Sequence, residues 1–260
     1  MSDSPVSMHT PGNEPSGEGA NAPDPAQQKQ MEQAYAQMKR KMSMAEIGRK
    51  IKHKIMVLSG KGGVGKSTVS VNLAVSLAKK KLKIGLLDAD IYGPSIPRML
   101  GITKKPSASK EKKILPYEKY GIKSMSIGNM IPDNSAIIWR GAMASSAIRQ
   151  LYNDVEWGSL DYLLLDLPPG TGDIQLSICQ NFNVNGAVIV STPQEISLID
   201  VRKAISMFNK VNVPIIGLVQ NMSYLKINGE KQSIFGKDGV IEEAKKQSLK
   251  FLGEIPIIPD

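Results

Sequence analysis

The chain has 260 residues and a formal charge of +9 at pH 7. This length is enough for one large α/β domain with an additional segment, and the positive charge favours anionic partners without determining a fold. No apolar segment approaches the roughly 20 residues of a membrane-spanning helix, and the N-terminal stretch lacks the basic and apolar regions of a secretory signal, so we expect a cytoplasmic protein without a membrane span.

Residues 1–26 are rich in Pro, Gly, Ser and Ala and have almost no large apolar side chains. Such a composition cannot offset the entropy cost of ordering, which predicts a disordered tail. Residues 27–54 contain no proline and many Gln, Lys and Arg residues, which predicts a basic helical segment. Its apolar residues recur at helical spacing: Met31, Tyr35, Met38, Met42 and Ala45. This stripe either packs against the globular domain or a partner, or lies on a membrane surface.

From Ile55 onward, apolar runs typical of buried strands alternate with helical patterns. The predicted strands are 55–59, 83–88, 122–127, 161–166, 186–191 and 213–219. The predicted helices are 68–80, 140–153, 173–181, 197–210 and 239–248. This alternation predicts an α/β domain over residues 55–260, with a mostly parallel sheet and helices on both faces. The basic stretch 104–119 shows no clear periodicity and is expected to be an exposed insertion.

The sequence GKGGVGKS, residues 60–67, lies between the first predicted strand and the first predicted helix. It satisfies the pattern G-x-x-x-x-G-K-[ST], in which backbone N–H groups surround phosphate oxygens at a helix N-terminus. The residues expected to bind the nucleotide are Gly60, Lys61, Gly62, Gly63, Val64, Gly65, Lys66, Ser67 and Thr68. The domain is therefore expected to be a P-loop NTPase, with Lys66 on the outer phosphates and Ser67 on Mg²⁺.

Aspartates stand at the ends of two further predicted strands, where ligands bind in open α/β sheets. Asp166 closes the strand of LLLD, and a carboxylate at this place beside a phosphate site is expected to hold Mg²⁺, directly or through water. Asp90 begins a loop after the strand that ends in Asp88, and we expect it to orient the attacking water. Asp88 itself is equally well explained as a turn former or cap.

Several segments together resemble the Mrp-type ATPases, which are iron–sulfur cluster carriers of the deviant-P-loop group that also contains the MinD and ParA ATPases. The segments are KGGVGKST, DADIYGPSIPRMLG, IIWRG, LLLDLPPGTGD, VIVSTPQEISLIDVRKAI and GLVQNMSY. The resemblance covers about residues 40–260. It implies a homodimer that binds ATP with Mg²⁺ and acts in iron–sulfur cluster assembly or transfer, with a scaffold or apoprotein clients as partners.

The same resemblance implies roles for three further residues. Lys61 matches the early lysine that reaches across the dimer interface to the partner's nucleotide, where a positive charge stabilises the transferred phosphoryl group. Asn221 matches the asparagine that contacts adenine. Pro256 matches the proline of a loop flanking the base. The catalytic set expected from motif and resemblance together is Lys61, Lys66, Asp90 and Asp166.

The cysteines depart from the family pattern. In many Mrp-type carriers, NMSY is followed by a C-x-x-C pair, and two pairs hold a bridging [4Fe–4S] cluster, but this chain continues without cysteine. Its one cysteine, Cys179, lies in a predicted helix, where a lone cysteine is most often a small buried hydrophobe. A cubane normally takes four thiolates, so the residues support the ATPase but not a self-contained cluster site. Relatives continue beyond the match to Asp260, so the domain is expected to be incomplete.

Two other functions stay open at this stage. A positioning or partition ATPase of the MinD and ParA type would bind a membrane or DNA through basic surface, for which residues 27–54 and 104–119 are the candidates. A scaffold that binds nucleotide and partners with hardly any turnover is the other. Nucleic acid is not expected as a partner in the main interpretation.

Overall fold

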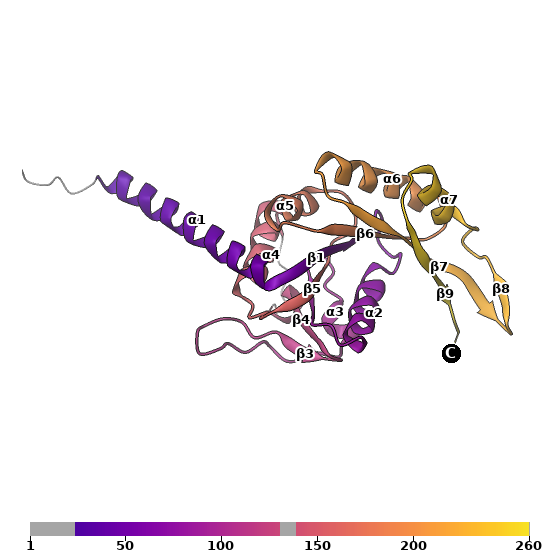
Figure 1. The fold of residues 1–260 in the computed structure, drawn as a ribbon, viewed down its shortest axis with the longest axis horizontal. Helices are drawn as coiled ribbons and strands as arrows, with labels where there is room; N and C mark the ends of the chain where they lie inside the picture. Colours follow the sequence, from indigo (N-terminus) through magenta and orange to yellow (C-terminus); the bar gives the residue numbers. More distant parts are fainter. Residues whose placement is uncertain (1–23, 131–138, 260) are drawn as a thin grey trace, which may run out of the picture. The chain divides into compact units, whose positions relative to one another are not determined.

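The computed structural model describes residues 24–130 and 139–259 (Figure 1). The α-helices are α1 (Pro25–Lys50), α2 (Lys66–Lys79), α3 (Ile96–Met99), α4 (Gly141–Asp154), α5 (Asp173–Asn181), α6 (Glu195–Lys210) and α7 (Gly239–Lys246), and a 3₁₀ turn spans Ile127–Asn129. The strands are β1 (Ile51–Leu58), β2 (Ile84–Asp88), β3 (Tyr117–Lys119), β4 (Ile122–Ser126), β5 (Leu160–Asp166), β6 (Gly186–Ser191), β7 (Ile215–Ile227), β8 (Glu230–Gln232) and β9 (Phe251–Ile257). The chain divides into two compact units, Met1–Lys41 and Met42–Asp260.

Helix α1 begins with a proline, whose fixed φ and missing N–H suit the first helical position. The predicted tail, 1–26, falls almost wholly outside the described residues. Four members of the predicted apolar stripe have exposed side chains, with 63 to 71% of their surface accessible: Met31, Tyr35, Met38 and Met42. Near the end of the helix, Ile47 is buried in the core.

The predicted end of this helix at residue 54 is wrong, because α1 ends at Lys50 and β1 begins at Ile51. The sequence IKHK has too many polar residues to read as a buried strand. In the fold these residues start β1 at the rim of the sheet, where Lys52 Nζ meets Asp161 Oδ1 at 2.7 Å and His53 stacks on Tyr162. Neighbouring β5 thus provides partners that the local pattern does not reveal.

The strands form one sheet in the order β3-β4-β2-β5-β1-β6-β7-β8, with β9 paired to β7, which makes nine strands over the described part of the chain. Pairing is parallel throughout, except for the short β3 and β8 at the ends. The predicted α/β class with a mostly parallel sheet is confirmed. Strand β1 lies between β5 and β6, so the loop after β1 leaves the middle of the sheet.

Both faces of the sheet are covered by helices (Figure 1). On β5, Leu163 and Leu165 belong to a core cluster that contains side chains of α4, α5, α6 and α7. Leu164, between them, belongs to a second cluster with side chains of α2 and α3. This alternation is the pleat of a strand buried on both faces, which explains why β5 reads as a continuous apolar run.

Three segments differ from the sequence prediction. The predicted insertion 104–119 ends in β3, and Ile114 packs against the core while bridging to Val155. Strand β8 consists of three polar residues. The apolar residues of β9, FLGEIPI, are interrupted by glycine, glutamate and proline, so the sequence pattern does not indicate a strand there. Pro256 lies within β9 rather than in a loop. A proline is tolerated there because β9 has a partner strand on one side only, β7, and needs no N–H group on the other side.

Among the described helices, none is long and apolar enough to cross a membrane.

Candidate nucleotide site

The loop between β1 and α2 is built on glycines that adopt conformations other residues avoid. Gly63 and Gly65 have φ angles of 80° and 82°, in the left-handed region where a Cβ is unfavourable. Gly65 is the N-cap of α2, and Val69 N donates to its carbonyl over 3.0 Å. The loop therefore presents backbone N–H groups at the positive end of the α2 dipole, which is an anion-binding arrangement.

Two elements that lie far along the sequence, α6 and β7, contact this loop. A Cβ on Gly60 would lie 2.4 Å from Cβ of Asp200 on α6, and a Cβ on Gly65 would lie 2.1 Å from Nδ2 of Asn221. The same Nδ2 donates to the carbonyl of Val64 over 2.8 Å. Asn221 thus holds the P-loop backbone in addition to any contact with a base, a role that the sequence did not reveal.

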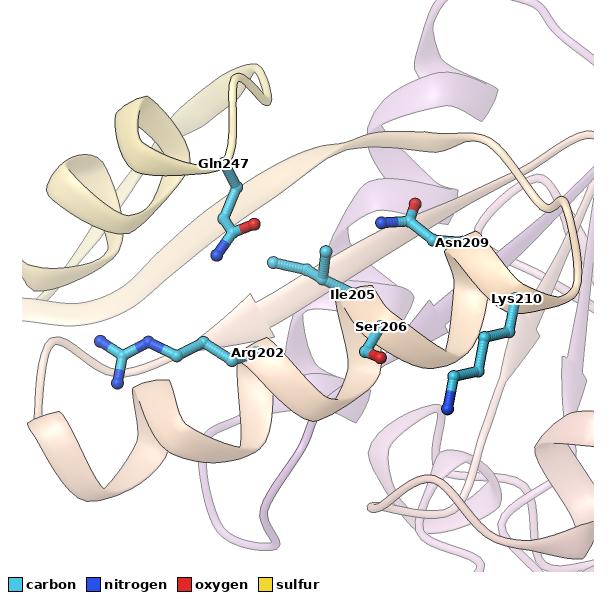
Figure 2. A pocket seen from close by; sticks show the side chains of 6 residues that line it. All are labelled: Arg202, Ile205, Ser206, Asn209, Lys210 and Gln247. Carbon is cyan, nitrogen blue, oxygen red and sulfur yellow. The ribbon is translucent and has the colours of Figure 1, made fainter.

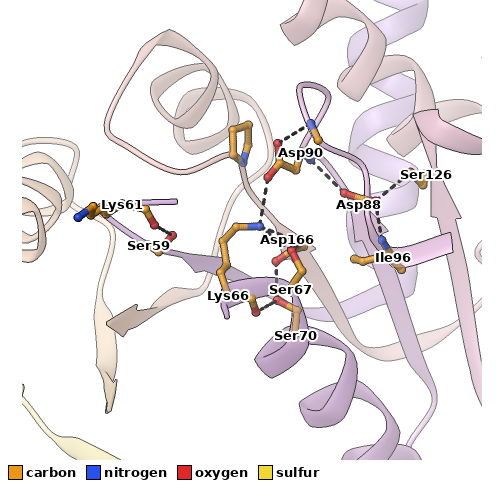
Figure 3. Close-up of polar contacts among 12 residues, drawn as sticks. Ser59, Lys61, Lys66, Ser67, Ser70, Asp88, Asp90, Ile96, Ser126 and Asp166 are labelled. Atoms are coloured by element: carbon orange, nitrogen blue, oxygen red, sulfur yellow. Dashed lines mark hydrogen bonds and ion pairs between the residues drawn. The ribbon is translucent and has the colours of Figure 1, made fainter. Parts of the chain in front are cut away.

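A buried polar cluster lies behind the loop (Figure 3). Nζ of Lys66 donates to Oδ2 of Asp166 over 2.8 Å and lies 3.5 Å from Oδ2 of Asp90. Oγ of Ser67 donates to the same Asp166 oxygen over 2.6 Å. Oγ of Ser70 donates to the other oxygen, Oδ1, over 2.6 Å. The fold therefore brings together four residues that the sequence selected and a fifth, Ser70, that it missed.

Asp88 organises the loop that carries Asp90. Its Oδ1 accepts from the backbone N–H of Asp90 over 3.2 Å, and its Oδ2 accepts from Ile96 N over 3.3 Å and from Ser126 Oγ over 2.9 Å. Burial, with a further contribution from the charge of Asp166, raises the pKa of Asp88 to about 7. Burial also raises the pKa of Asp90, while the charge of Lys66 acts in the opposite direction. Asp88 is thus more than a turn former, because it fixes the loop on both sides of Asp90.

This raised pKa makes stability depend on pH. The folded protein binds a proton at Asp88 more tightly than the unfolded chain does, so the contribution of the residue to stability falls as pH rises from about 3.8 to about 7. Relative to an Asp88→Asn variant, the wild type should lose at most about 1.4 kcal/mol of unfolding free energy per pH unit in this window. Urea unfolding of both proteins between pH 4.5 and 6.5 measures the slope.

The exposed carboxylate Glu156 provides the control. A Glu156→Gln variant, measured in the same way, controls for the loss of one negative charge. A stability difference between wild type and Asp88→Asn that stays constant over the window would contradict the raised pKa.

The oxygens of Ser67 and Asp166 fit Mg²⁺. The hydroxyl and the Oδ2 atom lie 2.6 Å apart at the N-terminus of α2, and Mg²⁺ prefers hard oxygen ligands, usually one or two from protein together with phosphate and water. The described residues contain no group of three or more His, Cys, Asp or Glu side chains arranged to hold a metal by themselves. The donor set is thus one that phosphate oxygens and water would complete.

Lys61 stands apart from this cluster. Its side chain is exposed and points away from Lys66 (Figure 3), while its carbonyl accepts from Ser59 Oγ over 2.8 Å. On α6, which supports the loop at Asp200, two large apolar side chains are exposed, Ile196 and Ile199. The structure therefore does not place the Lys61 ammonium with the other predicted catalytic residues of the same chain.

Two pockets adjoin the loop. A small one of about 200 Å³ is lined by loop glycines together with Ser95, Met99 and Pro169. A larger one of about 700 Å³ extends along α2 towards β9 and is mostly apolar; Thr68 and Asn221 line it, with Ile255. Neither is lined by Pro256. The expected base-binding asparagine thus faces a space large enough for a planar ring, and β9 contributes through neighbours of the predicted proline.

A further pocket lies between α6 and α7 (Figure 2). It has a volume of about 510 Å³ and is lined by Arg202, Ile205, Ser206, Asn209, Lys210 and Gln247. Its arginine is already paired, at 2.8 Å each, with Glu195 and Glu243. None of the residues predicted for the site lines this pocket, and we assign it no part in nucleotide binding.

Cys179 fits no cluster site. The residue lies on α5, is half-buried, and its Sγ is 3.7 Å from Sδ of Met56 in the core. Burial raises the pKa of the thiol to about 11, which disfavours the thiolate that metals require. The segment after NMSY forms the hairpin of β7 and β8 and contains no cysteine. The chain's own residues therefore do not fit an iron–sulfur cluster.

The close approach of Gly60 to α6 gives a direct test of the loop geometry. A Gly60→Ala variant must displace the backbone of Asp200, which would lie 2.5 Å from the new Cβ, and should lose about 1–3 kcal/mol of unfolding free energy. Gly62→Ala is the matched control, because its Cβ would meet nothing closer than Cγ of Pro169 at 3.9 Å. Equal unfolding free energies of the two variants in urea would contradict the contact.

Comparison with known proteins agrees with this site. Residues 50–260 match the family model described as ParA, NUBPL iron-transfer P-loop NTPase. The chain belongs to this family. It is 53% identical over 210 residues to an "Iron-sulfur protein required for NADH dehydrogenase, mitochondrial" of Arabidopsis thaliana, covering 80% of this chain and 67% of that protein. It is 50% identical over 214 residues to an "Iron-sulfur cluster carrier protein" of Aquifex aeolicus, covering 81% and 59%, so it spans only part of such relatives' length.

Solved structures of the family and of more distant proteins share the fold. The nucleotide-binding protein of Archaeoglobus fulgidus in complex with ADP is 44% identical, with a TM-score of 0.74 over 84% of this chain and 86% of that one. The cell division ATPase MinD of Pyrococcus furiosus is 21% identical, with a TM-score of 0.56 over 79% and 83%. At that identity the MinD likeness shows the fold alone. The chain is thus a P-loop NTPase with MinD-like architecture.

Proposed function

We propose that this family member hydrolyses ATP, as a homodimer with Mg²⁺, in the assembly of iron–sulfur clusters or their transfer to apoproteins. The observation that carries the proposal is the contact of Lys66 and Ser67 with Asp166 behind the glycine loop. The names of relatives that are about 50% identical to this chain support the iron–sulfur role. The ADP complex of the Archaeoglobus protein supports nucleotide binding. The partners are a cluster scaffold or apoprotein clients.

The charge balance of the cluster suits Mg²⁺-ATP. Two carboxylates, Asp90 and Asp166, pair with the single ammonium of Lys66 within the described residues. Their combined negative charge exceeds the positive charge of the ammonium, and a divalent cation relieves this excess. Ser67 and Asp166 would hold the ion, which screens the phosphate charges when bound. Lys66 and the loop N–H groups would bind the phosphates.

Asp90 is suited to orient a water molecule. Its carboxylate is largely buried, and Oδ1 accepts from Gly93 N over 3.3 Å while Oδ2 faces Lys66. A carboxylate fixed in this way can accept a proton from water and aim the oxygen at a terminal phosphate. Thr68, at the first turn of α2, would reach the α-phosphate, and Asn221 would contact the base. On β9, Ile255, next to the predicted Pro256, would flank the base.

Lys61 would complete the site of a second copy. An exposed lysine that points away from Lys66 suits contact with a partner rather than with its own phosphates. The exposed Ile196 and Ile199 on α6 supply apolar surface for such a partner. A cation delivered only when two subunits close stabilises charge on the transferred phosphoryl group, as an arginine finger does. Hydrolysis would then be slow in the monomer and coupled to dimerisation.

The two P-loop lysines should separate binding from turnover. Lys66→Ala should abolish nucleotide binding, whereas Lys61→Ala should keep it and lose at least about a hundredfold in phosphate release. Lys79→Ala, at an exposed lysine on α2, is the matched control. If Lys61→Ala released phosphate at the wild-type rate, the catalytic role of Lys61 would be excluded.

Mixed dimers distinguish a trans from a cis role. When the inactive variants Lys61→Ala and Asp90→Asn are combined, a dimer with one copy of each keeps one complete site only if Lys61 acts across the interface. Roughly a quarter of the wild-type rate should then return in an equimolar mixture of a two-fold symmetric dimer. No recovery would place Lys61 in the same subunit as its nucleotide.

Iron–sulfur clusters would be cargo that this chain does not hold alone. A homodimer offers two thiols, both from Cys179, half-buried beside Met56, and a cubane normally takes four thiolate ligands. Anaerobic reconstitution followed by iron and sulfide analysis should therefore show weak or no loading, with no difference for a Cys179→Ala variant. Stoichiometric cluster loading of the wild type that is lost in Cys179→Ala would contradict the absence of a cluster site in this chain.

A positioning or partition role on a membrane or DNA stays a prediction, as does the cytoplasmic location.

A further inference from the structure

Ser70 has a place in the site that neither motif nor family assigns. The residue lies on α2, four positions after Lys66, and its side chain is fully buried. Its Oγ lies 2.6 Å from Oδ1 of Asp166 and 3.1 Å from the carbonyl of Lys66. A hydroxyl has one hydrogen to donate. The shorter, charge-assisted bond to the carboxylate is the stronger of the two.

The two oxygens of Asp166 have different partners. Oδ2 accepts from Lys66 and Ser67, the residues expected on phosphate and metal. Oδ1 accepts from Ser70, which is the one side chain that bonds this oxygen in the described part of the chain. Asp166 is itself fully buried, so water does not replace the Ser70 hydroxyl. Ser70 therefore fixes which carboxylate oxygen faces the ligand side.

The hydroxyl is not needed to build the helix. Alanine has a higher helix propensity than serine, and α2 already accepts alanine at another buried position, Ala74. Close to Ser70 in sequence, Val69 packs in an apolar cluster with Val57 and Val190. A purely structural position of this kind would be filled as well by an apolar side chain, which leaves the bond to Asp166 as the physical use of the hydroxyl.

We propose that Ser70 is a positioning residue for the metal ion: it anchors Oδ1 of Asp166 so that Oδ2 and the Ser67 hydroxyl are set to bind Mg²⁺ together with the nucleotide. The proposal rests on the proposed function, because it takes Mg²⁺-nucleotide to be the ligand. Without the anchor, Asp166 keeps its charge but loses its orientation, and one buried oxygen loses its donor. Metal affinity should fall while metal-free nucleotide binding stays.

Binding of a fluorescent ADP analogue, with EDTA and at increasing Mg²⁺, tests this. Ser70→Ala should bind within about twofold of wild type in EDTA, while the Mg²⁺ concentration for half-maximal tightening should rise about tenfold, as for other residues that orient metal ligands. Ser70→Thr, which keeps a hydroxyl, should restore the Mg²⁺ dependence. Ser206→Ala, at an exposed serine of α6 in the pocket that has no part in nucleotide binding, is the matched control and should match wild type.

A double-mutant cycle shows whether Ser70 acts through Asp166. In an Asp166→Asn background, Ser70→Ala should cause no further change in Mg²⁺ dependence, because the carboxylate that binds the metal is gone. Ser70→Cys replaces the hydroxyl by a weak donor of similar shape. Ser70→Cys should therefore also raise the Mg²⁺ concentration for half-maximal tightening. This variant provides a second test in case Ser70→Ala lowers the stability of the fold.

The outcomes separate this proposal from the proposed function. An unchanged Mg²⁺ dependence in both Ser70→Ala and Ser70→Cys, equal losses with and without Mg²⁺, or additive effects with Asp166→Asn would each overturn the positioning role while leaving the nucleotide site in place. Wild type that binds no nucleotide under either condition would overturn the site and the positioning role together.

Discussion

The ion pair between Lys66 and Asp166 is the interaction on which the candidate site depends. Both side chains are buried, and Nζ lies 2.8 Å from Oδ2 at the point where β5 ends and α2 begins. Removing two charges from water costs about as much free energy as their mutual attraction returns. A protein with an apolar pair of similar volume in place of such an ion pair is often no less stable, whereas removing only one partner costs about 3–5 kcal/mol. The pair is therefore better explained by what it arranges than by stability. It sets the ammonium and one carboxylate oxygen at the N-terminus of α2, where phosphate and metal are favoured.

The surrounding groups keep this arrangement rigid by different means. Ser70 holds the far oxygen of Asp166, Asp88 fixes the loop of Asp90 to α3 and β4, and Asn221 ties the glycine loop to β7. The bonds of Ser70, Ser126 and Asn221 join elements far apart in sequence, so the site is a product of the assembled sheet. Burial is the main cause of the raised pKa of Asp88, and the charge of neighbouring Asp166 raises it further.

Lys61 and Cys179 show what one chain does not supply. The Lys61 side chain is exposed and points away from the cluster, so the catalytic contact proposed for it would need a second copy. The Cys179 thiol is half-buried against the core, with its pKa raised by burial. Relatives are named for iron–sulfur clusters, yet this sequence provides one thiol per chain. ATP chemistry and cluster ligation are thus separable in this family member, because a phosphate cradle needs backbone N–H groups while a cluster needs several thiolates.

The sequence by itself determined the α/β class, the strand–loop–helix unit around residues 60–67 and the choice of Lys66, Ser67, Asp90 and Asp166, because period, glycine spacing and strand-end carboxylates are local properties of the chain. It placed the start of β1 four residues late and missed the short strands β3 and β8. It also missed β9, whose apolar residues are interrupted by glycine, glutamate and proline and which is stabilised by pairing with β7. Only the tertiary structure decided that Ser70 bonds Asp166, that Ser126 of β4 bonds Asp88 and that Lys61 stands apart. Those relations depend on which strand ends and helix turns meet in space, and pairing across the sheet, not sequence spacing, sets them.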